Sequence, residues 1–156
     1  MRDLWPILNY EIQMYLGARH LQGFPVSRSD PNLLFIQQSA MTEVEALHIR
    51  ILTEIFLEKS EPDNLNIDDL VPAWRKDNAI LVHDLYDAYT KHLDTGHHPK
   101  YYLNRFLAHP DKRRGDHFDW SAIINRMDPP LQSIFKALSM DENRLPALVY
   151  FKKHIE

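Results

Sequence analysis

No glycine or proline interrupts the chain from Leu33 to Glu58, which predicts one long helix. Asp30 and Pro31 precede it; aspartate caps helices, and proline is tolerated in a first turn. At 1.5 Å per residue, such a helix spans roughly 39 Å. It therefore needs partners along its length, and we expect the other helices to pack on it. Apolar residues recur every three to four positions at Leu33, Ile36, Ala40, Val44, Leu47, Ile51 and Ile55.

The rest of the chain also favours helix. Further helices are predicted at about 3–22, 77–93, 100–109, from Trp120 to a stop at Pro129-Pro130, and at 131–139. The tail 144–155 is predicted as helix with a strand left open, and 60–73 as an irregular connector with one turn near 67–70. We therefore predict an all-α protein, a single-domain up-and-down helical bundle over residues 1–156 with about five to six helices and one long central helix.

Composition limits the kinds of site that the chain can build. A chain of 156 residues is most simply one domain, and its formal charge of −4 does not argue for nucleic acid. The absence of cysteine excludes disulfides and thiolate chemistry and fits a cytoplasmic protein. The amino-terminal residues lack the apolar run of a signal peptide, and no run of about 18 apolar residues predicts a membrane span.

Three histidines lie in predicted helices beside apolar residues: His48, His83 and His109. Glu45 and His48 form one Glu-x-x-His unit, but carboxylate-bridged dimetal bundles use two such units. We therefore expect no metal and no cofactor. A mononuclear three-histidine site, and with it a metal-dependent hydrolase, stays open as an alternative.

A basic and aromatic region follows at residues 97–117, with four histidines interleaved. Cations contact a phosphate backbone and rings stack on bases, so the region indicates RNA or another phosphate-bearing ligand. The alternative is a solvated loop that pairs with the acidic connector, within one chain or across a dimer. The basic residues of the region 97–117 are Lys100, Arg105, Lys112, Arg113 and Arg114, and its aromatic rings come from Tyr101 and Tyr102.

Two of these segments together resemble the HEPN-type α-bundles of prokaryotes, including their abortive-infection-like relatives. One segment is Glu45-Ala-Leu-His48-Ile-Arg50-Ile-Leu52; the other is Leu103-Asn104-Arg105-Phe-Leu-Ala-His109, followed by a basic loop. The resemblance implies a His-x-Arg pair on one helix and an Arg–polar–His set on another. The catalytic members of that family are metal-independent ribonucleases whose sites are paired across a dimer, with four to six residues between the Arg and the His. Here only three separate Arg105 from His109, and Asn104 stands at the four-residue spacing.

We therefore expect a dimeric HEPN-like module that is nucleic-acid-associated or regulatory, with weak or no catalysis. Its polar cluster is expected at Arg50, Arg105 and His109, with Glu45, His48 and Asn104 beside it. Arg105 is expected to be structural and buried against a carboxylate such as Glu45. Two alternatives stay open, a ribonuclease using Arg105 and His109 and a purely structural partner-binding bundle, so whether the protein is an enzyme is undecided.

Overall fold

The computed structural model describes residues 3–22, 30–58, 61, 63–94, 96–107, 120–138 and 144–155, without the side chains of 106, 107 and 151–155. These ranges contain helices and no strand, so the all-α prediction is confirmed. The helix count exceeds five to six in part because one-turn helices form at residues 67–70, within the connector, and at 74–77, just after it. The elements are α1 Trp5–Gln22, α2 Pro31–Leu57, α3 Ile67–Leu70, α4 Trp74–Asp77, α5 Ala79–Thr90, α6 Pro99–Tyr102, the π-helical η1 Leu103–Leu107, α7 Trp120–Leu138 and α8 Pro146–Ile155.

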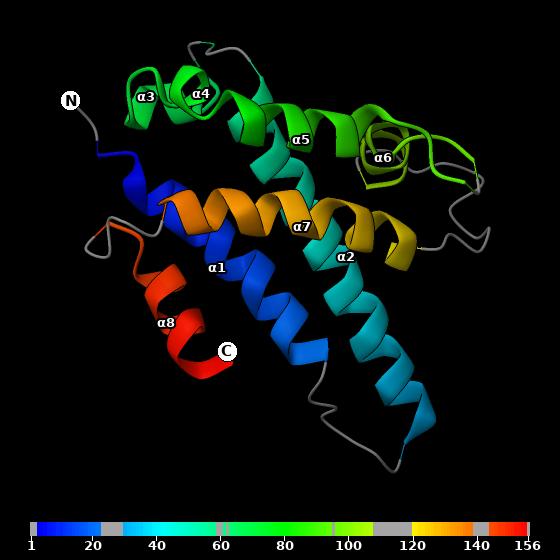
Figure 1. Cartoon of the computed structure of the whole chain (residues 1–156). Helices are drawn as coiled ribbons and strands as arrows, with labels where there is room; N and C mark the ends of the chain where they lie inside the picture. The colour runs from blue at the N-terminus through cyan, green and yellow to red at the C-terminus, as the bar shows by residue number, and fades with distance from the viewer. Residues whose placement is uncertain are drawn as a thin grey trace.

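The long helix α2 begins as the sequence predicts. Oδ1 of Asp30 accepts hydrogen bonds from the backbone N–H groups of Asn32 (2.9 Å) and Leu33 (3.3 Å), and Pro31 occupies the first turn. Helix α1 runs antiparallel to α2 over most of the length of α1 (Figure 1). These two helices form the frame on which the other elements pack.

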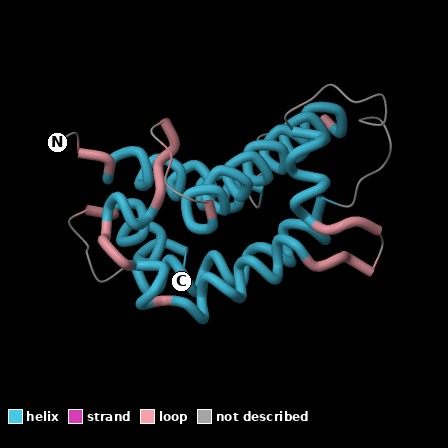
Figure 2. Tube along the Cα trace, turned by 90° about the horizontal axis from the view of Figure 1, so that it is seen from above, coloured by secondary structure: helices cyan, strands magenta, loops and turns pink. Residues whose placement is uncertain are grey.

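A second antiparallel pair, α5 and α7, runs across the first (Figures 1 and 2). Helix α8 lies along α1, where the backbone N–H of Ala147 donates to Oδ1 of Asn9 at 3.0 Å. One cluster of buried apolar side chains joins α1, α2, α5, η1, α7 and α8. No described helix is both long and apolar enough to cross a membrane.

Only the second half of α2 is enclosed by the other helices. Its buried residues start at Glu45 and continue to Phe56. In the first half, Leu33 is 53% exposed, Phe35 70% and Ile36 60%. The expectation of packing along the whole helix is therefore wrong for the described residues, and the first half presents an apolar face.

The sequence led us to expect that Pro129 and Pro130 stop a helix. They lie instead inside the continuous α7. An interior proline lacks the N–H that bonds to the carbonyl four residues earlier and costs about 3 kcal/mol. The buried face of α7 offsets this cost by placing six side chains in the core. These are Ile123, Met127, Leu131, Ile134, Phe135 and Leu138.

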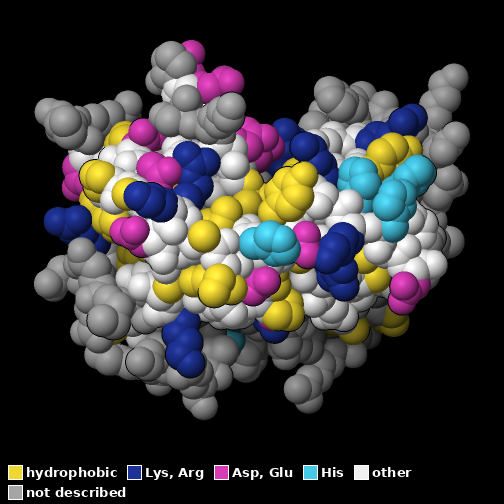
Figure 3. Space-filling view, turned by 45° about the horizontal axis from the view of Figure 1, so that its top comes forward, with side chains coloured by type: hydrophobic (Ala, Val, Ile, Leu, Met, Phe, Trp, Pro, Cys, Tyr) yellow, Lys and Arg dark blue, Asp and Glu magenta, His cyan; other side chains and the backbone are white. Residues whose placement is uncertain are grey.

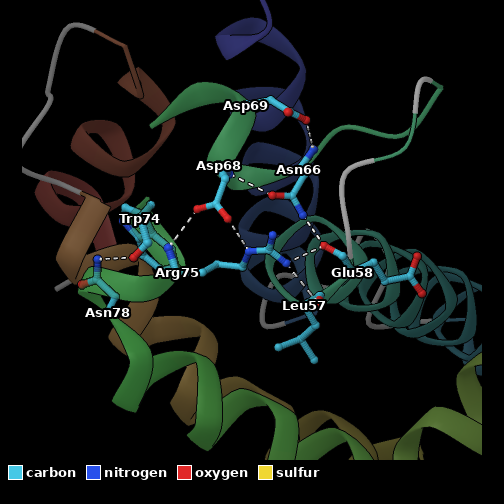
Figure 4. A network of polar contacts seen from close by, with 8 residues as sticks. All are labelled: Leu57, Glu58, Asn66, Asp68, Asp69, Trp74, Arg75 and Asn78. Atoms are coloured by element: carbon cyan, nitrogen blue, oxygen red, sulfur yellow. Dashed lines mark hydrogen bonds and ion pairs between the residues drawn. The ribbon is translucent and has the colours of Figure 1, made fainter. Parts of the chain in front are cut away.

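Arg75 attaches the connector to the end of α2 (Figure 4). Its guanidinium donates to the carbonyl oxygens of Glu58 (2.7 Å) and Leu57 (3.5 Å) and, through Nε, to Asp68 (2.6 Å). Asn66 caps α3 and also donates to the Glu58 carbonyl. Asn66 of the connector and Arg75 of α4 thus satisfy terminal carbonyls of α2, and the predicted turn at residues 67–70 is confirmed as α3.

Candidate nucleic-acid interface

A tight turn between α5 and α6 positions the aromatic residues of the basic region. Gly96 has φ +153°, and a Cβ there would lie 2.5 Å from the hydroxyl of Tyr102. That hydroxyl accepts a hydrogen bond from the backbone N–H of His97 at 3.1 Å. The glycine therefore lets Tyr102 approach the turn and fix the backbone of His97.

His98 and Pro99 begin α6. Nδ1 of His98 accepts a hydrogen bond from the backbone N–H of Tyr101 at 3.0 Å, and Pro99 is buried in the first helical turn. Leu103, fully buried, anchors the following π-helical turn. Turns of this kind occur frequently at functional sites. A capped, anchored segment thus carries the side chains that follow.

Three side chains at a four-residue spacing form a stack on this segment. The ring centroids of His97 and Tyr101 lie 4.1 Å apart, and the angle between the two ring planes is 32°. Cζ of Arg105 lies 5.5 Å from the ring centroid of Tyr101. His97 and Arg105 are exposed, and Tyr101 is half-buried. We call His97, Tyr101 and Arg105 the ring–cation stack. It offers planar faces and positive charge side by side.

A set of polar side chains surrounds the buried Tyr89, between α2, α5 and η1. Nζ of Lys100 lies 5.9 Å from the ring centroid of Tyr89. Burial, together with the nearby Glu54 carboxylate, raises the pKa of Tyr89 to about 12, while Arg50 and a hydrogen bond from Asn104 oppose the shift. Nε of Arg50 donates to Glu54 at 2.8 Å. This arrangement joins the two predicted residues Arg50 and Asn104 through Tyr89.

The histidines of the turn also gather here, at the right of the face seen in Figure 3. The ring of His92 lies 6.1 Å from that of His97 and 5.5 Å from that of His98. Burial lowers the pKa of His98, and the neighbouring His92, His97 and Lys100 lower it further. No three His, Asp or Glu side chains among the described residues form a metal-binding group.

The other predicted residues lie elsewhere. Glu45 and His48 face α1 and do not reach the ring–cation stack. Arg105 is exposed, so the expectation that it is buried against Glu45 is wrong. The reason is that Leu103, two residues earlier, takes the core position of the π-helical turn. His109, Lys112, Arg113 and Arg114 lie outside the described residues.

Glu45 and His48 belong instead to a buried polar layer between α1, α2 and α7. Nδ1 of His48 lies 2.6 Å from Oε2 of Glu11, and Gln22 donates to Oε2 of Glu45 at 2.6 Å. Among the described residues, Oε1 of Glu45 has no hydrogen-bond partner, and burial raises the pKa of this carboxyl group despite Arg19 and Gln22. Neither Glu45 nor His48 is accessible to a ligand, because they are 1% and 6% exposed.

A second contact in the same layer links α1 to α7. The hydroxyl of Tyr15 donates to Oδ1 of Asp128, which also pairs with Arg19 and accepts from Gln132 at 3.1 Å. Burial is the main reason that the pKa of Tyr15 is raised. This contact keeps the hydroxyl of a fully buried tyrosine hydrogen-bonded, so we assign a structural role to the buried polar layer.

Tyr89 and His92 also belong to the interface, and neither was predicted from the sequence as a site residue. Both lie on or just after α5, and Tyr89 looked like one more residue of an apolar stripe. The four-residue spacing of residues 97, 101 and 105 was the signal that could have identified the stack.

Comparison with known proteins adds no assignment: no protein-family model matches the chain, and neither a curated protein nor a solved structure is significantly similar to it.

Proposed function

We propose that this protein is a HEPN-like helical bundle that binds single-stranded RNA at the ring–cation stack and does not cleave it. The observation that carries the proposal is the exposed stack of His97, Tyr101 and Arg105 on one fixed segment. The HEPN relationship rests on the two sequence segments alone.

Single-stranded nucleic acids bind to this combination of groups. Bases stack on aromatic rings and on arginine guanidinium planes without a sequence requirement, and lysine or arginine contacts the phosphates. The stack offers a ring and a guanidinium, and Lys100 lies exposed one residue before Tyr101. A strand that follows α6 would therefore meet a stacking partner and at least two cations.

The proposal that the RNA is not cleaved rests on the spacing of the motif and on the burial of His48. A ribonuclease needs a general acid or base within hydrogen-bond reach of the reacting group. Only three residues separate Arg105 from His109, where the catalytic pattern has four to six. His48 is buried and paired with Glu11, so it does not supply that group.

The test is the affinity of single-residue variants for a fluorescein-labelled oligouridine. Tyr101→Ala should weaken binding about 5- to 150-fold, because base–aromatic stacking contributes about 1–3 kcal/mol per base. Arg105→Ala should reduce the slope of log K against log salt by about 0.7, as expected for one lost phosphate contact. Its melting temperature should stay nearly unchanged, because the side chain is exposed.

Arg144 supplies a matched control, because its guanidinium lies 5.1 Å from the ring centroid of Trp5 at another place on the protein. Arg144→Ala should bind RNA like the wild type, and gel analysis should show intact RNA after every titration. Equal losses of RNA affinity in Arg105→Ala and Arg144→Ala would show that the RNA is held by general surface charge and not by the stack. RNA cleavage that disappears in Arg105→Ala would favour the ribonuclease alternative.

We further propose that two copies pair through the first half of α2. The exposed side chains of Leu33, Phe35 and Ile36 lie on a segment, residues 31–42, that carries no charge. Two such helices can pack antiparallel without opposing like charges, and a twofold interface uses the same patch on both copies. Exposed apolar patches of this kind mark interaction sites.

Light scattering should therefore give twice the chain mass at micromolar protein, and Ile36→Glu should give the mass of one chain. Ile80→Glu is the matched control, because Ile80 is 78% exposed on α5, and it should leave the dimer intact. A wild-type mass of one chain, or equal behaviour of the two variants, would contradict pairing through α2.

A further inference from the structure

His98 is the N-cap residue of α6, at the start of the segment that carries the ring–cation stack. Its backbone is extended, with φ −78° and ψ 158°, as the following Pro99 favours. Nδ1 of its ring accepts a hydrogen bond from the backbone N–H of Tyr101 at 3.0 Å, and the same N–H reaches the carbonyl oxygen of His98 at 3.0 Å. Because the donor is a backbone N–H, Nδ1 must offer a lone pair. The imidazole that makes this contact is therefore neutral, with its proton on Nε2.

Protonation of His98 reverses the role of Nδ1. An imidazolium has an N–H at both ring nitrogens and no acceptor. Its Nδ1–H would face the N–H of Tyr101 across the 3.0 Å of the present hydrogen bond, so the ring cannot keep this position. Positive charge is also unfavourable beside the N–H groups at the start of a helix. The charged ring therefore leaves the cap and loosens the turn that it holds.

The charged and titratable groups beside His98 all disfavour its protonation. The ring centroid of His92, just after α5, lies 5.5 Å from that of His98, while His97 precedes His98 and Lys100 lies on α6. Burial is the first cause of the lowered pKa of His98, and these three groups lower that pKa further. A histidine with a lowered pKa contributes stability above the unfolded-state value of about 6.5, and this stability is lost as pH falls through the folded-state value.

Other titratable groups lie on the elements around α6, and none of those described contributes to the lowered pKa of His98. Burial raises the pKa of Tyr89 to about 12, so its hydroxyl stays neutral during acidification. Arg50 and Glu54 of α2 pair with each other at 2.8 Å. Lys91 pairs with Asp87, and Asp94 is exposed in the turn. The histidines of the turn are therefore the described groups here that change charge between about pH 8 and pH 5.

We propose that His98 is a pH switch for the ring–cation stack: the neutral ring holds Tyr101 in place for RNA, and the protonated ring releases it. Tyr101 links the two parts, because its N–H bonds to the cap while its ring lies 4.1 Å from that of His97 and 5.5 Å from Cζ of Arg105. The regulation of RNA binding rests on the function proposed above, whereas the movement of the turn does not. Acidification also charges His92 and His97, which attracts phosphate, so the stacking contribution and not the total affinity reports the switch.

An NMR titration of the free protein from pH 8 to pH 5 tests the movement of the turn. The backbone amide signal of Tyr101 should shift with the same midpoint as the His98 ring, below about 6.5. His98→Asn is the matched variant, because asparagine caps helices and does not titrate, and this transition should be absent from it. His92→Gln should move the His98 midpoint to higher pH, because it removes one group that lowers this pKa. A Tyr101 signal that does not follow the His98 ring, or that shifts equally in His98→Asn, would overturn the switch.

The effect on RNA is measured as the loss of affinity for a rhodamine-labelled oligouridine that Tyr101→Ala causes at pH 8 and at pH 5. With His98 present, this loss should be at least about twofold smaller at pH 5, the lower end of the range for a lost N-cap, because the His98 carbonyl still accepts from Tyr101. In His98→Asn the loss should be equal at the two pH values; His92 and His97 titrate in both proteins, so their charge cancels.

Equal losses at pH 8 and pH 5 with His98 present would overturn the regulation of RNA binding. No loss in Tyr101→Ala at pH 8 would instead contradict the RNA site itself, and the NMR titration would then decide the switch alone.

Discussion

Replacing His48 with alanine is expected to lower the free energy of unfolding by about 3–5 kcal/mol, because it leaves the Glu11 carboxylate buried without its partner. The two side chains lie 2.6 Å apart between Nδ1 and Oε2, and the residues are 6% and 9% exposed. For a domain of this size the melting temperature should fall by roughly 6–20 °C. Thermal and urea unfolding followed by circular dichroism measure both quantities.

His83→Ala is the matched control. The side chain of His83 is 70% exposed and contacts Asp87 only at 3.8 Å, so the change should stay within about 0.5 kcal/mol of the wild type. The double variant Glu11→Met/His48→Leu should recover most of the loss, because apolar side chains can replace a buried pair at little cost. A small loss of unfolding free energy in His48→Ala, or equal losses in His48→Ala and His83→Ala, would contradict a structural role for the pair of Glu11 and His48.

Arg75→Ala should lower the free energy of unfolding by about 2–3 kcal/mol, the second largest effect that we expect. The variant loses hydrogen bonds to the terminal carbonyls of α2 and leaves Asp68 without its cation, and hydrogen bonds to charged groups contribute about 1.5–3 kcal/mol. Lys76→Ala, at the exposed neighbouring position on α4, should have almost no effect. Equal effects at the two positions in urea unfolding would contradict the role of Arg75 as a cap for α2.

The same contact predicts a dependence on pH. Burial alone would raise the pKa of Asp68, but hydrogen bonds from the backbone and side chain of Arg75 outweigh it and hold that pKa below its usual value. A lowered pKa contributes stability above the unfolded-state value of about 3.9, and this stability is lost as pH falls through the folded-state value. Between about pH 5 and pH 2 the wild type should therefore lose more stability than Arg75→Ala.

The features that the sequence predicted correctly depend on neighbouring residues. Asp30 caps α2 as predicted, and its side chain lies within three residues of the N–H groups that it accepts from. The continuity of α7 through Pro129 and Pro130 was missed because burial of Ile123, Met127 and Leu131 overrides the local preference of proline. The all-α class followed from the helical period of the apolar stripes and from the aspartate and proline residues at predicted helix starts.

The candidate site was predicted only in part, for the same reason. Residues 97–105 lie together in sequence, so their aromatic and basic character was visible. The buried pair joins residues 37 positions apart, and nothing near Glu11 or His48 indicates which helix the other lies on. The exposure of Arg105 depends on the π-helical turn after Leu103, and a regular helical period does not predict such a turn.

The central claim is that RNA binds at the ring–cation stack, and photocrosslinking tests it most directly. An oligonucleotide that carries 4-thiouridine is bound to the wild-type protein, irradiated, and the modified residues are identified by mass spectrometry. We expect crosslinks within residues 97–105, centred on Tyr101, that disappear in Tyr101→Ala and persist in Tyr86→Ala, a variant at an exposed tyrosine of α5. Crosslinks that avoid this segment, or that survive unchanged in Tyr101→Ala, would contradict it.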